Sequence, residues 1–126
     1  MPHQTIKTSA APQPAGPYSQ AVDADGMVFI SGQIPLDPET GALKGSSIQE
    51  QARQAMRNLK AVLKASGLLP DALVKTTVFL RSMDDFSAFN AVYEEELGGA
   101  RPARSVVEVS ALPRGALVEI EAVACR

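Results

Sequence analysis

The stretch from Ser47 to Gly67 constrains the fold most, because its apolar residues recur at the period of an α-helix. Ser47-Ile-Gln-Glu50 has the form of a capping box, Lys64 suits the last turn, and Gly67 predicts the C-terminal end. Such a helix must bury its apolar stripe against another element. The predicted stripe is Ile48, Ala52, Ala55, Met56, Leu59, Val62 and Leu63, and the opposite, solvated side carries Gln51, Arg53, Arg57, Lys60 and Lys64.

Segments on both sides of this helix alternate between apolar and polar residues, which predicts β-strands. Asp25-Gly26 lies between two such runs, residues 19–23 and 27–31, and indicates a hairpin. A short strand over residues 5–8 would make the first third a β-meander. Further strands are predicted over residues 73–81, 101–109 and 117–125.

A second helix is predicted to begin at Ser82 or Asp84 and to end at Gly98-Gly99. Its apolar stripe is Phe86, Phe89, Val92, Tyr93 and Leu97. The chain has 126 residues, of which 45% are hydrophobic, and this length suits one core. We therefore expect a single α+β domain over residues 1–126, with two helices on one face of a mixed sheet.

The other face of this sheet has no helix left to cover it. We expect the helices to cover Val74, Val78, Val107, Val109, Val118 and Ile120, and the open face to carry Phe29, Ser31, Thr77, Phe79, Arg104, Val106, Glu108, Glu119 and Glu121. That mixture is too apolar for water alone and too charged for an ordinary core. It therefore predicts self-association, with polar pockets at the interfaces between copies of the chain. A β-bulge in any strand would exchange its faces.

Composition narrows the function classes. A net charge of -2 without a run of basic residues argues against nucleic acid as the partner. No apolar run is long enough to span a membrane, and the first residues lack the features of a secretory signal, which predicts a cytoplasmic protein. One cysteine, Cys125, and one histidine, His3, form neither an intramolecular disulfide nor a usual zinc site. No metal is expected.

The open face offers limited chemistry. Arg104 could bind a small carboxylate through its planar fork of donors, or it could simply pair with Glu108 on a solvated surface. Glu119 or Glu121 could accept a proton or orient water, beside small polar residues at Ser31-Gly32. This set suits the addition of water to a small electrophilic acid, and equally suits plain binding of a carboxylate.

A series of motifs, in order along nearly the whole chain, resembles the RidA (YjgF) family of reactive-intermediate deaminases. These motifs are Gly16-Pro-Tyr-Ser-Gln20, Ser31-Gly-Gln-Ile-Pro35, Gln51-Ala-Arg53 with Asn58-Leu59, Val74-Lys-Thr-Thr-Val78, Pro102-Ala-Arg-Ser105 with Val107-Glu-Val109, and Glu119-Ile-Glu-Ala122. The resemblance implies a chorismate-mutase-like α+β subunit in a homotrimer, with sheets facing inward and ligand clefts between subunits. It also implies cofactor-free hydrolysis of 2-imino acids or their enamines, such as 2-iminobutanoate and 2-iminopropanoate, to 2-oxo acids and ammonia.

The resemblance assigns roles residue by residue. Arg104 matches the arginine that holds the substrate carboxylate, and Glu119 the acid that orients water. Tyr18 matches the aromatic residue of the cleft, and Ser31, Gly32 and Asn90 its polar surroundings. Val106 stands in the cleft where many members have cysteine, so a thiol is not essential here, and regulation through that thiol is not expected.

Two other function classes remain open at this point. The first is a non-catalytic trimer that binds 2-oxo acids or related carboxylates through the same arginine. The second is a related hydrolase that acts on another enamine, such as an aminoacrylate, or on RNA. Turnover of an imine separates the first class from the deaminase, and the acidic composition disfavours RNA.

Overall fold

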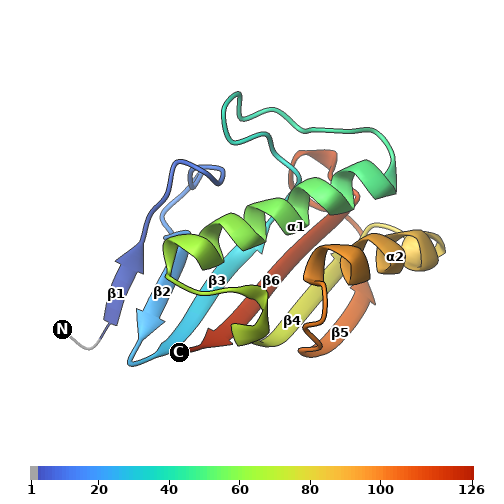
Figure 1. The fold of residues 1–126 in the computed structure, drawn as a ribbon. Coiled ribbons are helices and arrows are strands. Elements are labelled where there is room, and N and C mark those ends of the chain that lie inside the picture. Colours follow the sequence, from blue (N-terminus) through green and yellow to red (C-terminus); the bar gives the residue numbers. More distant parts are fainter. Residues whose placement is uncertain (1–2) are drawn as a thin grey trace.

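A computed structural model describes residues 3–126 as two helices lying on one face of a six-stranded sheet (Figure 1). The strand order is β1-β2-β3-β6-β4-β5, with β4 and β5 parallel and every other pair antiparallel. This arrangement confirms the α+β fold with a mixed sheet. The elements are β1 (His3–Ile6), β2 (Ala21–Ala24), β3 (Met27–Gln33), α1 (Ile48–Ala65), β4 (Leu73–Leu80), α2 (Phe86–Leu97), β5 (Ala103–Glu108) and β6 (Val118–Cys125).

Both ends of α1 follow from local sequence. Ser47 Oγ accepts the Glu50 amide at 3.1 Å, and Glu50 Oε1 accepts the Ser47 amide at 3.2 Å, which confirms the capping box. At the other end Gly67 has φ +77°, and the next amide, of Leu68, donates to the Leu63 carbonyl at 2.9 Å. All seven predicted stripe residues are buried. The α1 stripe therefore packs as its period indicates.

Gln51 was predicted to lie on the solvated side of α1, but this prediction is wrong because the residue is buried. Its Oε1 accepts the Leu117 amide at 2.8 Å, and its Nε2 donates to the Gly45 carbonyl at 3.1 Å. The long amide side chain thus satisfies backbone groups of two loops, which periodicity could not reveal.

The hairpin between β2 and β3 forms as predicted. Asp25 and Gly26 have φ of +55° and +92°, and Ala24 pairs with Met27 across the turn. Two consecutive left-handed residues produce the twist that a two-residue hairpin needs, and Asp-Gly adopts them at low cost. Strands β1, β2 and β3 form the expected antiparallel meander.

The face of strand β5 that lies against the helices is not the predicted face but the opposite one. In its parallel pairing with β4, Arg104 lies beside Thr76 and Val106 beside Val78, and both β4 residues are buried under the helices. Arg104, Val106 and Glu108 therefore lie on the helix face. Alternation defines two faces for a strand, but only the register with its neighbour decides which face is covered.

Two further residues of the predicted core are exposed for related reasons. Val107 is 43% exposed because it shares the open face of β5. Val74, also 43% exposed, falls in the register shift between Leu73 and Lys75. Val109, also expected in the core, is only partly buried. The remaining predictions hold, since Val78, Val118 and Ile120 are buried.

The open face of the sheet is apolar and acidic, as predicted. Phe29 is 48% exposed there, and a row across three strands joins Glu119, Phe79 and Val107. Neither of the two helices lies on this side (Figure 1). The face is thus uncovered within the described chain.

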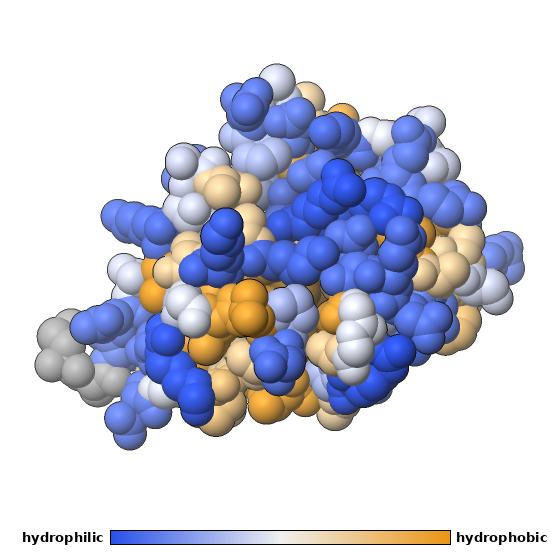
Figure 2. All heavy atoms as spheres, viewed as in Figure 1, coloured by the Kyte–Doolittle hydropathy of each residue, from blue (hydrophilic) through white to orange (hydrophobic). Residues whose placement is uncertain are grey.

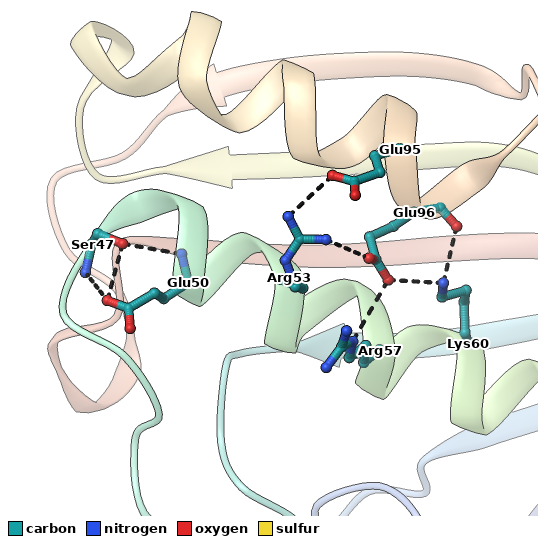
Figure 3. Close-up of polar contacts among 7 residues, drawn as sticks. All are labelled: Ser47, Glu50, Arg53, Arg57, Lys60, Glu95 and Glu96. Atoms are coloured by element: carbon teal, nitrogen blue, oxygen red, sulfur yellow. Dashed lines mark hydrogen bonds and ion pairs between the residues drawn. The ribbon is translucent and has the colours of Figure 1, made fainter.

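The basic residues of α1 bind α2 rather than forming only a solvated surface (Figure 3). Glu96, whose side chain is 9% exposed, accepts Arg53 at 2.8 Å and Lys60 at 2.8 Å, with Arg57 at 3.9 Å. The outer surface over the two helices is largely hydrophilic (Figure 2). This ion-pair cluster joins the two helices above the sheet.

Within residues 3–126, none of the helices is both long and apolar enough for a membrane span.

Candidate functional site

Arg104 lies in a cleft between β5 and α2. Its guanidinium carbon lies 4.8 Å from the centre of the Tyr93 ring and 5.6 Å from that of Phe86. Its Nη1 donates to Asn90 Oδ1 at 2.7 Å. The cleft has a volume of about 360 Å³ and is lined by Asn90, Tyr93, Glu94, Leu97, Arg101, Pro102 and Arg104. Two aromatic rings and an amide of α2 therefore hold one guanidinium on the helix face of β5, the edge strand of the sheet.

Helical spacing explains why α2 can make these contacts. Phe86, Asn90 and Tyr93 are four and then three residues apart, so they share one side of the helix. The sequence analysis treated the two aromatics as core and missed their contact with Arg104. The helical spacing of Phe86 and Tyr93 from Asn90 was the signal that could have placed both rings beside Arg104.

The guanidinium retains free donors for a ligand. Arginine carries five N–H donors, and among residues 3–126 the Arg104 side chain uses one of its nitrogens, Nη1, in a hydrogen bond. The edge formed by Nε and Nη2 matches the two oxygens of a carboxylate. This geometry suits the anion-binding role expected for Arg104.

Glu119 belongs to a different cleft, on the open face of the sheet. This second cleft, of about 230 Å³, is bordered by the proline-rich connector between β1 and β2 (residues 7–20), the end of β3 and the loop before β6. The Glu119 carboxylate passes over Gly32, where an added β-carbon would lie 2.8 Å from Glu119 Cδ. Gly32 is thus required for close approach rather than for a special φ angle. The residues lining this cleft include Tyr18, Gly32, Arg114 and Glu119.

Burial raises the pKa of Glu119 above the ordinary glutamate value, and the charge of Glu121 raises that pKa further. Within the described residues the Glu119 carboxylate makes no hydrogen bond or ion pair that would oppose this shift. A buried carboxyl group whose pKa is raised in this way is a candidate for general acid–base chemistry.

Tyr18 and Ser31 border the same region of the open face. Tyr18 is 53% exposed, and its hydroxyl accepts the Ala15 amide at 3.3 Å. The Ser31 hydroxyl donates to the Ser19 carbonyl at 2.6 Å, which leaves its oxygen lone pairs for other partners. The two side chains line a shallow depression with Phe29 and Glu121.

Gln20 supports this region and was missed as a functional residue. It is buried, its Oε1 accepts the Thr8 amide at 2.7 Å, and its Nε2 donates to the Thr8 carbonyl at 3.0 Å and the Pro12 carbonyl at 2.9 Å. These bonds tie the proline-rich connector to the start of β2. The connector is thereby held where it presents Tyr18.

The structure brings the predicted site residues together as two separate groups. Arg104 and Asn90 form the first, on the helix face, whereas Glu119, Gly32, Tyr18 and Ser31 form the second, on the open face. No residue lines both main clefts. Val106 shares a face with Arg104 but packs against the core and lines neither cleft. No three His, Cys, Asp or Glu side chains within residues 3–126 are placed to hold a metal ion.

The fold, two helices on one face of a mixed six-stranded sheet, matches a known class of proteins. The chain belongs to the endoribonuclease L-PSP family, whose family model matches residues 8–126. A protein of Yersinia pestis assigned to the conserved Rid family, YyfA, has a structure with a TM-score of 0.95 at 46% identity, covering 98% of this chain and 99% of its own. The resemblance to RidA proteins is therefore confirmed.

Two relatives are informative about function. The 2-iminobutanoate/2-iminopropanoate deaminase of Mus musculus is 48% identical over 121 residues, which are 96% of this chain and 90% of the mouse protein. The structure of Escherichia coli TdcF with bound serine has a TM-score of 0.92 at 43% identity and covers 98% of both chains.

Proposed function

We propose that this chain is a cytoplasmic enzyme that hydrolyses 2-imino acids, such as 2-iminobutanoate and 2-iminopropanoate, to 2-oxo acids and ammonia. The observation that carries the proposal is Arg104, a guanidinium held by Asn90 with its Nε and Nη2 edge free for a carboxylate. The name of the mouse relative, at 48% identity over nearly the whole chain, supports this reaction. The serine bound to the TdcF relative is itself a small molecule with a carboxylate.

Complete sites are proposed to form between copies of the chain. Arg104 and Glu119 line clefts on opposite faces, so one chain presents them to different ligands. Joining copies through the open face would bury Phe29 and Val107, which are 48% and 43% exposed. We infer a homotrimer with its sheets facing inward, in which Arg104 of one subunit and Glu119 of the next meet one substrate.

The proposed mechanism uses these two groups in separate roles. Arg104 binds the carboxylate and positions the neighbouring imine carbon. Glu119, when ionised, accepts a proton from water as the water oxygen forms a bond to that carbon, and it passes this proton to the imine nitrogen as the C=N π bond breaks. The tetrahedral intermediate then collapses: the new hydroxyl gives its proton to the amino nitrogen through Glu119, the C=O bond forms as the C–N bond breaks, and ammonia departs, leaving the 2-oxo acid and ionised Glu119.

Tyr18, Ser31 and Gly32 line the Glu119 side of the pocket in this proposal. Val106, which was predicted to contact the substrate, packs against the core on the helix face and lines neither cleft of the single chain. Water is the nucleophile and the imine is already electrophilic, so the reaction as written needs no cofactor.

The proposal is tested by competition with semicarbazide. An amino-acid oxidase generates 2-iminobutanoate in the cuvette, semicarbazide traps it, and a deaminase lowers the semicarbazone signal. We expect the wild type to suppress the signal and Arg104→Ala not to. Arg81→Ala is a matched control, because Arg81 is exposed and lines neither cleft, and it should behave as the wild type.

Failure of the wild type to lower the signal would contradict the deaminase. In that case titration with 2-oxobutanoate would test the alternative, a trimer that binds small carboxylates without turnover.

A further inference from the structure

A buried hydroxyl on β4 has no role in the mechanism above. Thr76 is 0% exposed and occupies a helix-facing position like Val78, where an apolar side chain would pack equally well. A hydroxyl in such a place is unfavourable unless it is hydrogen-bonded. Its hydrogen bond is made with the Tyr93 hydroxyl, at 2.7 Å.

Strand register places this bond directly beside Arg104. Thr76 is the Cα partner of Arg104 in the β4–β5 pairing, so their side chains emerge on the same face of adjacent strands. Tyr93 spans both of them: its hydroxyl bonds Thr76, and its ring lies 4.8 Å from the Arg104 guanidinium carbon. One side chain of α2 thereby connects the strand core to the guanidinium.

Tyr93 is itself held firmly. It is 6% exposed, and the Phe89 ring packs against it with a centroid separation of 5.5 Å. With its hydroxyl fixed at one end and a neighbouring ring at its side, the Tyr93 ring offers a rigid surface to Arg104.

We propose that Tyr93 is a positioning residue for Arg104, and that Thr76 fixes Tyr93 for this purpose. The Tyr93 ring sets the plane of the guanidinium and Asn90 holds Nη1, which leaves Nε and Nη2 pre-oriented for the substrate carboxylate. This inference rests on the proposed imine deaminase function.

The first experiment compares Tyr93→Leu with Phe89→Leu in the full-length protein. Both changes remove a buried aromatic ring from α2, but of these two rings it is Tyr93 that lies against the Arg104 guanidinium. We expect Tyr93→Leu to raise KM for 2-iminobutanoate about tenfold with kcat within about twofold, because carboxylate binding is weakened equally in ground and transition states. Phe89→Leu should lower Tm but raise KM by no more than about twofold, because the Thr76 hydroxyl still holds the Tyr93 ring beside Arg104.

A double-mutant cycle keeps the proposal testable if Tyr93→Leu does not fold. Tyr93→Phe and Thr76→Val each break the hydroxyl pair and should each raise KM about two- to threefold. The double variant should raise KM no further than either single variant, since the same link is lost. Its Tm should recover toward the wild type, because no unpaired hydroxyl remains.

Four results would overturn the inference. Equal changes in KM for the two leucine variants, or additive KM effects in the cycle, would give Tyr93 a role in packing alone. If KM is unchanged in all Tyr93 and Thr76 variants while Arg104→Ala abolishes activity, Tyr93 again has a role in packing alone. The proposed deaminase function would then still stand. Full activity of Arg104→Ala would instead remove the proposed anion site and this inference together.

Discussion

Arg104 and Glu119 lie on opposite faces of the same sheet, with Arg104 on the edge strand β5 and Glu119 on β6, separated by β4. Arg104 is held against α2, whereas Glu119 lies over Gly32 on the side without helices. The proposed reaction uses both groups, so we expect it to need two copies of the chain.

Subunit mixing tests this relationship. Arg104→Ala and Glu119→Gln should each be nearly inactive, but oligomers re-formed from an equal mixture should regain about a quarter of wild-type activity, because each site draws its arginine and its glutamate from different subunits. The measurement is the semicarbazide assay after joint refolding. Each variant refolded alone is the control, and activity no greater than in these controls would place both groups in one subunit.

Activity at acid pH is expected to depend on Glu121. Burial and then the charge of Glu121 raise the pKa of Glu119, and the mechanism requires ionised Glu119, so kcat/KM should fall as pH drops through this raised pKa. Glu121→Gln removes one cause of the shift and should move the acid limb of the profile to lower pH. Glu39→Gln, in an exposed loop, should leave the profile unchanged. A limb that stays in place or moves upward in Glu121→Gln would contradict the assignment.

Gly32→Ala should impair catalysis while preserving the fold. The added methyl would meet the Glu119 carboxyl group, which must then move. We expect kcat to fall on the order of 100-fold, as misplacement of a catalytic group by about an ångström can produce. Gly99→Ala is the matched control, because nothing lies within 4 Å of a β-carbon there. The kcat of Gly32→Ala combined with Glu119→Gln should be no lower than that of Glu119→Gln alone. A wild-type kcat in Gly32→Ala would argue against this geometry.

Glu96 is expected to contribute to stability in a pH-dependent way. Burial alone would raise the pKa of Glu96, but the hydrogen bond and charge of Lys60, together with Arg53 and Arg57, outweigh burial and lower the pKa. A lowered pKa stabilises the fold above the ordinary glutamate value, and this stability is lost as pH falls through the lowered pKa.

Urea unfolding at two pH values measures this contribution. At neutral pH Glu96→Gln should lower the free energy of unfolding by about 1–2 kcal/mol, and the difference from wild type should shrink in acid as pH falls through the lowered pKa of Glu96. Glu95→Gln is the control, because the Glu95 side chain is 64% exposed and its pair with Arg53 should contribute less than about 0.5 kcal/mol. A difference for Glu96→Gln that grows in acid would reverse the expected sign.

The secondary structure was predictable because its signals are local. The helical period and capping box over residues 47–67 and the Asp25-Gly26 turn each involve residues close together in the chain, and all three appear in the structure as expected. The motif series likewise identified the family before any geometry was known.

The faces of β5 were not predictable in the same way. Its alternation separated Arg104 and Val106 from Ser105 and Val107 correctly, but assigned the wrong set to the helices. A strand's period is a property of its own residues, whereas its phase relative to the core depends on pairing with β4, a segment about 30 residues away.

Sequence was thus sufficient for most of the helices and strands and for the family, and it singled out Arg104 and Glu119 as the predicted site residues. Tertiary structure alone decided that these two groups occupy separate clefts, and that Tyr93, Thr76 and Gln20 hold their surroundings in place. The physical reason is that propensity, capping and periodicity act between chain neighbours, whereas register, stacking and burial join residues that only folding brings together.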